Sequence, residues 1–217
     1  MAKKKTETKI DIIGAYMNNM LEHGHRPKSI YSFCKGLGIK ESNFYEQFGS
    51  FDIVEKNIYK TFFDNTVNVL AKNNEYATYN PQNRLLSFYY TFFEVLKSNR
   101  SYVLLSLKEE RNKLKALSTL SLLRKVFQEY VEDLEIDTLN LREERLEKVK
   151  ELGMKEWTWA QLLFTLKFWI EDDSAGFEKT DILIEKSINT SFALLDNSTL
   201  NSVFDLGKFL FKEKMMA

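Results

Sequence analysis

The chain of 217 residues is 44% hydrophobic and 14% aromatic, and it contains 8 glycines and 2 prolines. This composition supplies a large core and favours long helices with short connections over a β-sandwich. The formal net charge is zero, which argues against a protein that coats nucleic acid through overall positive charge but leaves a local basic patch open. Cys34 is the single cysteine, so an intrachain disulfide is excluded and we expect a cytoplasmic protein.

The N-terminal segment predicts three helices. Residues 8–23 carry a broad apolar stripe, and Gly24 follows as a residue that can end a helix with a positive φ. A second helix begins at Ser29, and Gly38 supplies the backbone freedom that a tight turn between two helices needs. A short third helix follows at residues 41–48.

Nine positions of this segment share the spacing of a known helix-turn-helix, including a Tyr-x-x-Phe ending after Gly-Ile. They are Ser29, Ile30, Phe33, Cys34, Gly38, Ile39, Phe44, Tyr45 and Phe48. In this pattern the chain resembles the TetR family of transcriptional regulators. The resemblance implies an all-α fold, in which a DNA-binding head (residues 1–49) is joined by a long helix to a ligand-binding and dimerisation body (residues 50–217).

The resemblance also implies which residues contact DNA. The third helix would lie in the major groove and present its side chains to base edges, where Asn and Gln pair with adenine and Glu accepts from cytosine. Other polar side chains would hold phosphates, which position the protein without reading the sequence. The expected base readers are Lys40, Glu41, Ser42, Asn43 and Gln47, and the expected phosphate contacts are Lys28, Ser29 and Tyr45.

Two features depart from the family pattern. Phe51 stands where the family usually has a lysine, and the third helix carries Glu41 and Glu46 but no Lys or Arg within it. Acidic groups near phosphates weaken DNA binding. An alternative function therefore stays open, that of a lipid-binding or scaffolding protein of the same fold that has lost operator binding.

The rest of the chain predicts further helices and no strand alternation. Asn80 and Pro81 are a strong helix start, because Asn caps and Pro fits the first turn. The highly charged stretch 137–153 predicts a short exposed helix or a partly mobile segment. The other predicted helices cover residues 50–72, 81–97, 102–107, 117–134, 155–172, 178–196 and 199–214.

The sequence predicts neither an enzyme nor a cofactor or metal site. It has no Gly-rich phosphate loop, no Cys-x-x-Cys and no His-Glu-x-x-His, and its two histidines, His23 and His25, fall in one loop without ligand partners at metal-binding spacing. It also shows neither a signal peptide nor an uncharged run of membrane-spanning length, so we expect no membrane insertion.

By resemblance, the body encloses a pocket for a small hydrophobic molecule that makes a repressor release its operator, and its last long helices form a homodimer. Residues 168–188 also resemble a TetR variant related to lipid-binding proteins of coenzyme Q biosynthesis, which favours a lipid-like ligand. The expected pocket residues are Phe88, Phe92, Tyr102, Trp159 and Phe164, although each aromatic residue taken alone is more often plain core. The expected interface residues are Leu162, Leu166, Trp169, Ile184, Ile188 and Phe192.

Overall fold

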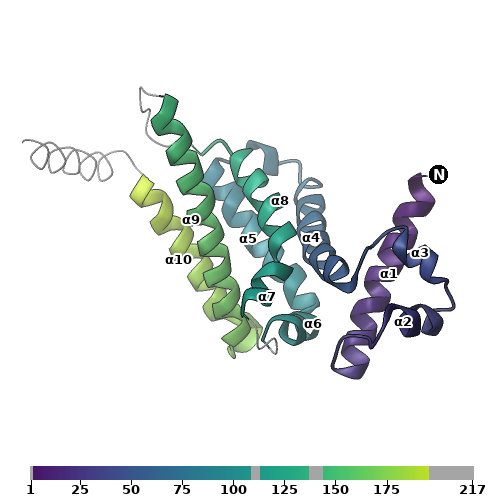
Figure 1. Cartoon of the computed structure of the whole chain (residues 1–217). Coiled ribbons are helices and arrows are strands. Elements are labelled where there is room, and N and C mark those ends of the chain that lie inside the picture. Colours follow the sequence, from purple (N-terminus) through teal and green to yellow (C-terminus); the bar gives the residue numbers. More distant parts are fainter. Residues whose placement is uncertain (1, 109–112, 137–143, 196–217) are drawn as a thin grey trace, which may run out of the picture. The chain divides into compact units, whose positions relative to one another are not determined.

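The computed structural model describes residues 2–108, 113–136 and 144–195 (Figure 1). These residues contain α-helices and no strand, which confirms the predicted all-α fold. The helices are α1 (Ala2–His23), α2 (Ile30–Gly36), α3 (Glu41–Tyr45), α4 (Phe51–Leu70), α5 (Pro81–Ser98), α6 (Arg100–Val103), α7 (Lys113–Thr119), α8 (Ser121–Glu132), α9 (Glu144–Glu171) and α10 (Glu178–Leu195). The predicted helix at 199–214 lies outside the described residues.

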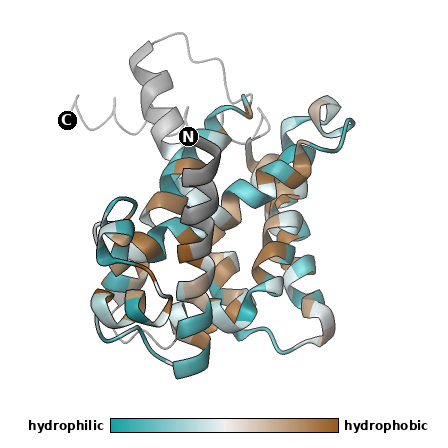
Figure 2. Ribbon diagram, turned by 90° about the vertical axis from the view of Figure 1, so that its right-hand side faces the viewer, coloured by the Kyte–Doolittle hydropathy of each residue, from teal (hydrophilic) through white to brown (hydrophobic). Residues whose placement is uncertain are grey.

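The chain divides into two compact units. Unit 1 comprises Met1–Lys72 and Thr91–Phe127, and unit 2 comprises Asn73–Tyr90 and Gln128–Ala217, so that α5 and α8 each contribute to both. Hydrophobic (brown) and hydrophilic (teal) residues are interspersed along the helices in Figure 2, as expected of amphipathic helices that each bury one face.

Local sequence signals set the helix ends in the N-terminal segment. Ser29 caps α2 in a reciprocal capping box, in which the Ser32 amide donates to the Ser29 hydroxyl at 3.1 Å. Gly38 has a φ of 68° in the turn between α2 and α3, a conformation that costs glycine little. Ser50 caps α4 by accepting a hydrogen bond from the Ile53 amide at 3.4 Å.

The core of the N-terminal segment is a cluster of aromatic rings centred on Phe51, the first residue of α4. The Phe51 ring centroid lies 5.2 Å from that of Tyr16 and 5.6 Å from those of Phe33 and Phe44. Phe51 is therefore buried together with side chains from α1, α2 and α3. This packing explains the departure from the family pattern, because a lysine at this position would place its charge in the core.

Several predicted helices have different boundaries in the structure: α1 begins at Ala2 and not at residue 8, α3 ends at Tyr45 and not at residue 48, and α6 ends at Val103. Two further differences are larger. The segment 117–134 is divided between α7 and α8, because the Leu120 amide donates to the Leu117 carbonyl in a tight turn and the Thr119 hydroxyl donates back to the Lys115 carbonyl. The tryptophan-rich segment 155–172 is the C-terminal part of the longer α9, which begins at Glu144.

In unit 2, α9 and α10 pack against each other as a helical hairpin. The connection is organised by Asp172, whose carboxylate accepts hydrogen bonds from the amide and hydroxyl of Ser174 and from the amide and hydroxyl of Thr180, at 2.6–2.9 Å. Gly176 and Phe177 both have a positive φ in this turn (65° and 68°). The carboxylate thus caps the start of α10 and links it to the end of α9.

Candidate functional site

The first candidate site is the exposed face of the helix-turn-helix formed by α2 and α3. Phe44 is completely buried and anchors α3 in the aromatic core, while Tyr45 beside it is 53% exposed. The Glu46 amide closes the last turn of α3 on the Ser42 carbonyl at 2.9 Å. The face of α3 opposite Phe44 is therefore available to a partner.

The eight predicted DNA-contacting residues differ in how exposed and how engaged their side chains are. Five of them are exposed, and these are Lys28, Lys40, Ser42, Asn43 and Tyr45.

Three others are partly engaged. Ser29 is exposed, but its hydroxyl already serves the α2 cap. Glu41 is half-buried. Burial of the Cys34 thiol on α2 raises the pKa of this thiol, and the negative charge of Glu41 raises it further. Gln47 is half-buried, and its Oε1 atom has no hydrogen-bond partner among the described residues.

A polar network joins this head to α4. The Arg26 guanidinium donates to both carboxylate oxygens of Glu55, at 2.7 and 3.1 Å, and also to the Asp52 carboxylate. Tyr16 of α1 donates its hydroxyl hydrogen to the same Glu55. Glu55 is 8% exposed, so its charge depends on these partners rather than on water.

The network shifts the pKa values of Arg26, Asp52 and Tyr16. Burial opposes the charge of Arg26, but the hydrogen bonds to Glu55 and Asp52 outweigh it and raise the pKa of the guanidinium. The hydrogen bond from Arg26 lowers the pKa of Asp52. Burial and then the negative charge of Glu55 raise the pKa of Tyr16, which remains a donor at all ordinary pH values.

Sequence reasoning missed this network because its members are far apart in the chain. A weak signal existed, since Tyr16 and Glu55 both fall on the buried faces of their helices.

The second candidate site lies on α9 and α10. The structure buries five of the predicted interface residues within the protomer, on the inner faces of these helices. These are Leu162, Leu166, Trp169, Ile184 and Ile188, while Phe192 is half-buried. Both helices are apolar on more than one side, so a dimer interface through these residues stays a prediction.

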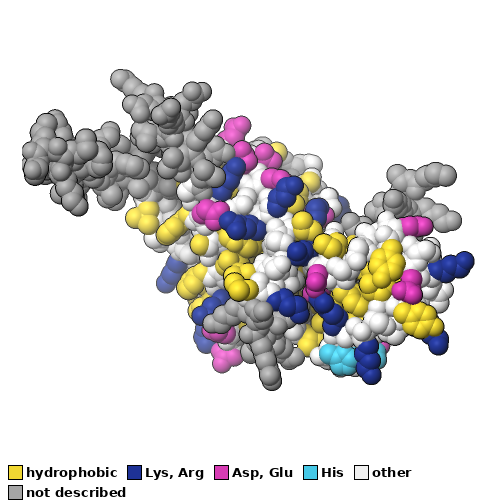
Figure 3. Space-filling model, viewed as in Figure 1, with side chains coloured by type: hydrophobic (Ala, Val, Ile, Leu, Met, Phe, Trp, Pro, Cys, Tyr) yellow, Lys and Arg dark blue, Asp and Glu magenta, His cyan; other side chains and the backbone are white. Residues whose placement is uncertain are grey.

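The outer side of the hairpin carries other apolar residues. Trp157 and Phe164 of α9 are 56% and 58% exposed, and Ile182 and Leu194 of α10 are also exposed. In the view of Figure 3, exposed hydrophobic side chains lie over α9 and α10 and also over the N-terminal helices, and charges of both signs are interspersed among them.

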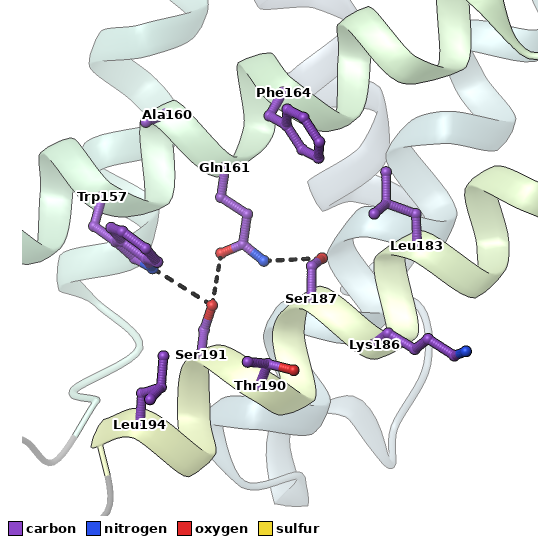
Figure 4. Close-up of a pocket in the computed structure, with 10 residues that line it drawn as sticks. All are labelled: Trp157, Ala160, Gln161, Phe164, Leu183, Lys186, Ser187, Thr190, Ser191 and Leu194. Carbon is purple, nitrogen blue, oxygen red and sulfur yellow. Dashed lines mark hydrogen bonds between the residues drawn. The ribbon is translucent and has the colours of Figure 1, made fainter. Parts of the chain in front are cut away.

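A groove of about 510 Å³ lies between α9 and α10 on this outer side, with Trp157 and Phe164 on its α9 side (Figure 4). It is lined by Trp157, Ala160, Gln161, Phe164, Leu183, Lys186, Ser187, Thr190, Ser191 and Leu194. We call this feature the α9–α10 groove.

The five residues predicted to line a ligand pocket do not form one set. Phe164 lines the α9–α10 groove, whereas Trp159 is buried within unit 2. Phe88, also in unit 2, stacks on Tyr130 with ring centroids 4.7 Å apart. Phe92 and Tyr102 are buried in unit 1.

Across the described ranges of the chain, none of the helices has the length and apolar character needed to cross a membrane. The same ranges hold no group of three or more His, Cys, Asp or Glu side chains placed to bind a metal ion.

An all-α chain with an N-terminal helix-turn-helix that exposes one face of its second helix defines the class of helix-turn-helix regulators. The comparisons agree: residues 84–210, more than half of the chain, match the family described as the tetracycline repressor-like C-terminal domain. No curated protein matches the chain. The chain belongs to the TetR family of transcriptional regulators.

Proposed function

We propose that this TetR-family regulator binds operator DNA as a homodimer and releases it when a small hydrophobic molecule binds the body. The observation that carries the proposal is the exposed start of α3. There the N-cap residue Lys40 offers a cation, and Ser42 and Asn43 of the helix offer a hydroxyl and an amide. Asn43 has the side chain that pairs bidentately with adenine, and Lys40 carries the charge that attracts a phosphate or guanine.

The homodimer supplies the second recognition helix. Two copies of α3 about 34 Å apart would enter successive major grooves on one side of the DNA. The exposed apolar face around Trp157 and Phe164 supports dimerisation, since a monomer leaves such side chains in water.

Release would follow from a movement of α4. This helix contacts both α1 and α7, and Arg26 ties the head to its first turns. A ligand that shifts α4 would therefore shift the head and change the separation of the two recognition helices. We expect this ligand to be hydrophobic and lipid-like, in line with the resemblance of residues 168–188.

A second function has two observations in its favour. Glu41 and Glu46 place negative charge at the start of α3 and just after its end. Phe51 is buried in the aromatic core, at a position where the family usually has a lysine. These features favour a lipid-binding or scaffolding protein without an operator.

The experiment that tests the proposal measures binding to a labelled fragment of the gene's own upstream region, at low and physiological salt and with excess competitor DNA. Binding that survives the competitor supports a specific regulator. If binding is absent even at low salt, the lipid-binding function is favoured, and extraction of the purified protein followed by mass spectrometry identifies a bound lipid.

A further inference from the structure

The floor of the α9–α10 groove holds a row of polar side chains whose hydrogen bonds have a fixed direction (Figure 4). The indole N–H of Trp157 can only donate, and it donates to the Ser191 hydroxyl oxygen at 3.4 Å. Ser191 in turn donates to the Gln161 Oε1 atom at 3.3 Å. The Gln161 Nε2 atom donates to the Ser187 oxygen at 3.2 Å, and Ser187 donates to the Ile184 carbonyl.

This row leaves the Gln161 amide half used. A primary amide has two N–H donors and two oxygen lone pairs. Ser187 takes one donor and Ser191 takes one lone pair, so one donor and one lone pair of Gln161 have no partner among the described residues. The indole uses its single donor within the row, and each serine hydroxyl uses its donor and one of its two lone pairs, so Gln161 is the member with an unused donor.

The surroundings of Gln161 indicate that the groove is covered. Trp157 precedes Gln161 by one helical turn and Phe164 follows it by nearly one turn, so the amide lies between two aromatic side chains that are more than half exposed. A partner that covers these rings also removes water from the amide. It must then offer both an acceptor and a donor at one point, since an unpaired polar group in a dry interface is destabilising.

A second copy of the same amide meets this requirement. Across a two-fold axis, the free N–H of each Gln161 can donate to the free lone pair of the other Gln161 oxygen. The symmetry makes both hydrogen bonds form together. We propose that Gln161 lies on the two-fold axis of the homodimer and pairs with Gln161 of the second copy, which fixes the register in which the two α9–α10 faces meet. This inference rests on the proposed homodimer.

The pairing gives Gln161 a role between the exposed rings of Trp157 and Phe164. Contacts between apolar rings alone would let two copies slide along each other, whereas an amide pair is lost in every register but one. Gln161 thereby selects a second copy of this chain over another protein with a similar apolar face.

The first test replaces the amide by a carboxylate of the same shape, Gln161→Glu, and measures the dimer dissociation constant by analytical ultracentrifugation. Two carboxylates facing each other on the axis repel, so we expect the dimer dissociation constant at pH 7.5 to be at least tenfold higher than that of the wild type. The dimer should be regained near pH 5, where the two carboxylates can share a proton. Lys186 is the charged side chain that lines the groove, and it is present in every variant.

The matched control is Thr190→Glu, which adds the same charge to the same groove one helix away from the expected axis. The new carboxylate lies four residues after Lys186 and can pair with it, so we expect little change in the dissociation constant and no recovery at pH 5. Equal effects of the two variants would contradict the pairing.

A second test measures geometry. In a Cys34→Ala background, Gln161→Cys should be cross-linked rapidly by a short bismaleimide, because the axis brings the two thiols together, whereas Glu178→Cys at the start of α10 should not. Circular dichroism checks that each variant is folded. A wild type that is monomeric at all concentrations overturns the homodimer and the pairing, and a wild-type dimer in which neither Gln161 variant behaves as expected overturns the pairing alone.

Discussion

Tyr16 donates a hydrogen bond of 2.5 Å to Glu55, which lies 39 residues further along the chain. Glu55 also receives two hydrogen bonds from Arg26, so α1, the α1–α2 connection and α4 meet at one buried carboxylate. The head of this regulator is therefore held to α4 by a buried polar contact as well as by aromatic packing.

The network predicts a large effect of Arg26→Ala. The substitution removes the cation from a carboxylate that is 8% exposed, and leaving such a charged group without its partner costs roughly 1–3 kcal/mol. The free energy of unfolding, measured by urea titration, should fall by this amount. Lys28→Ala, an exposed neighbour without such a partner in the network, is the control and should leave it within about 0.5 kcal/mol of the wild type. Equal values for the two variants would show that the network contributes nothing to stability.

Restoring the family's usual residue with Phe51→Lys should weaken the protein rather than improve it. Phe51 is 7% exposed and its ring contacts those of Tyr16, Phe33 and Phe44. Loss of a buried phenylalanine costs about 3–5 kcal/mol. Thermal denaturation should show a strongly lowered midpoint, with Phe51→Leu intermediate between this variant and the wild type. A Phe51→Lys protein as stable as the wild type would rule out a core role for this ring.

Asp172 predicts a pH dependence of stability. Burial raises the pKa of this carboxyl, but the hydrogen bonds from Ser174 and Thr180 outweigh burial and lower the pKa to about 2. Because the folded value lies below the unfolded value, the carboxylate contributes stability above about pH 4, and this contribution is lost as the pH falls towards 2.

The variant Asp172→Asn should therefore lose about 2 kcal/mol at pH 7 and little at pH 2. Urea titrations at several pH values measure the difference. Asp173→Asn, at an exposed neighbouring carboxylate, should follow the wild-type curve. A constant difference between Asp172→Asn and the wild type at every pH would contradict the assignment.

Two substitutions in the head should separate base reading from phosphate contact. Asn43→Ala should cost about 1–3 kcal/mol in operator affinity and relax the preference at one base pair. Lys28→Ala should weaken binding to all sequences alike and reduce the slope of log affinity against log salt by about 1. Fluorescence anisotropy against the operator and a scrambled fragment measures both, with the exposed Lys72→Ala as the control. A Lys28→Ala protein that loses specificity but keeps its salt slope would reverse the two roles.

The two faces of α9 should respond differently to truncation. Leu166 is 4% exposed, so Leu166→Ala should cost about 2–5 kcal/mol of unfolding free energy. Phe164 is 58% exposed, so Phe164→Ser should leave the stability of the protomer nearly unchanged and raise the dimer dissociation constant. Calorimetry and ultracentrifugation on the same samples give both quantities. A dimer unaffected by Phe164→Ser would place the interface elsewhere.

Much of the fold follows from local chemistry that the sequence displays. Several of these local signals act on residues only a few positions away. They are the caps Ser29 and Ser50, the turn at Gly38 and the helix start at Asn80 and Pro81. These positions therefore predicted the start of α2, the turn before α3 and the start of α5. The all-α fold was predicted from the resemblance and from the absence of strand alternation. The head's exposed polar residues could likewise be predicted, because buried Phe44 fixes the orientation of the short α3.

The faces of α9 could not be predicted in the same way. Leu162, Phe164 and Leu166 are all large and apolar, and periodicity alone does not say which of them meets α10 and which meets water. The Arg26 network was hidden for a related reason, since the residues that it joins lie 26 or more positions apart and meet only through tertiary packing.

The place of Phe51 in the aromatic core decides how this protein can be divided. A proteolytic or genetic cut after residue 49 would leave the three N-terminal helices without the ring around which they pack, and without the carboxylate that Arg26 and Tyr16 share. A swap of heads between relatives must carry the first turns of α4 with it. The N-terminal unit that stays packed when it is moved to another protein is therefore longer than the helix-turn-helix itself.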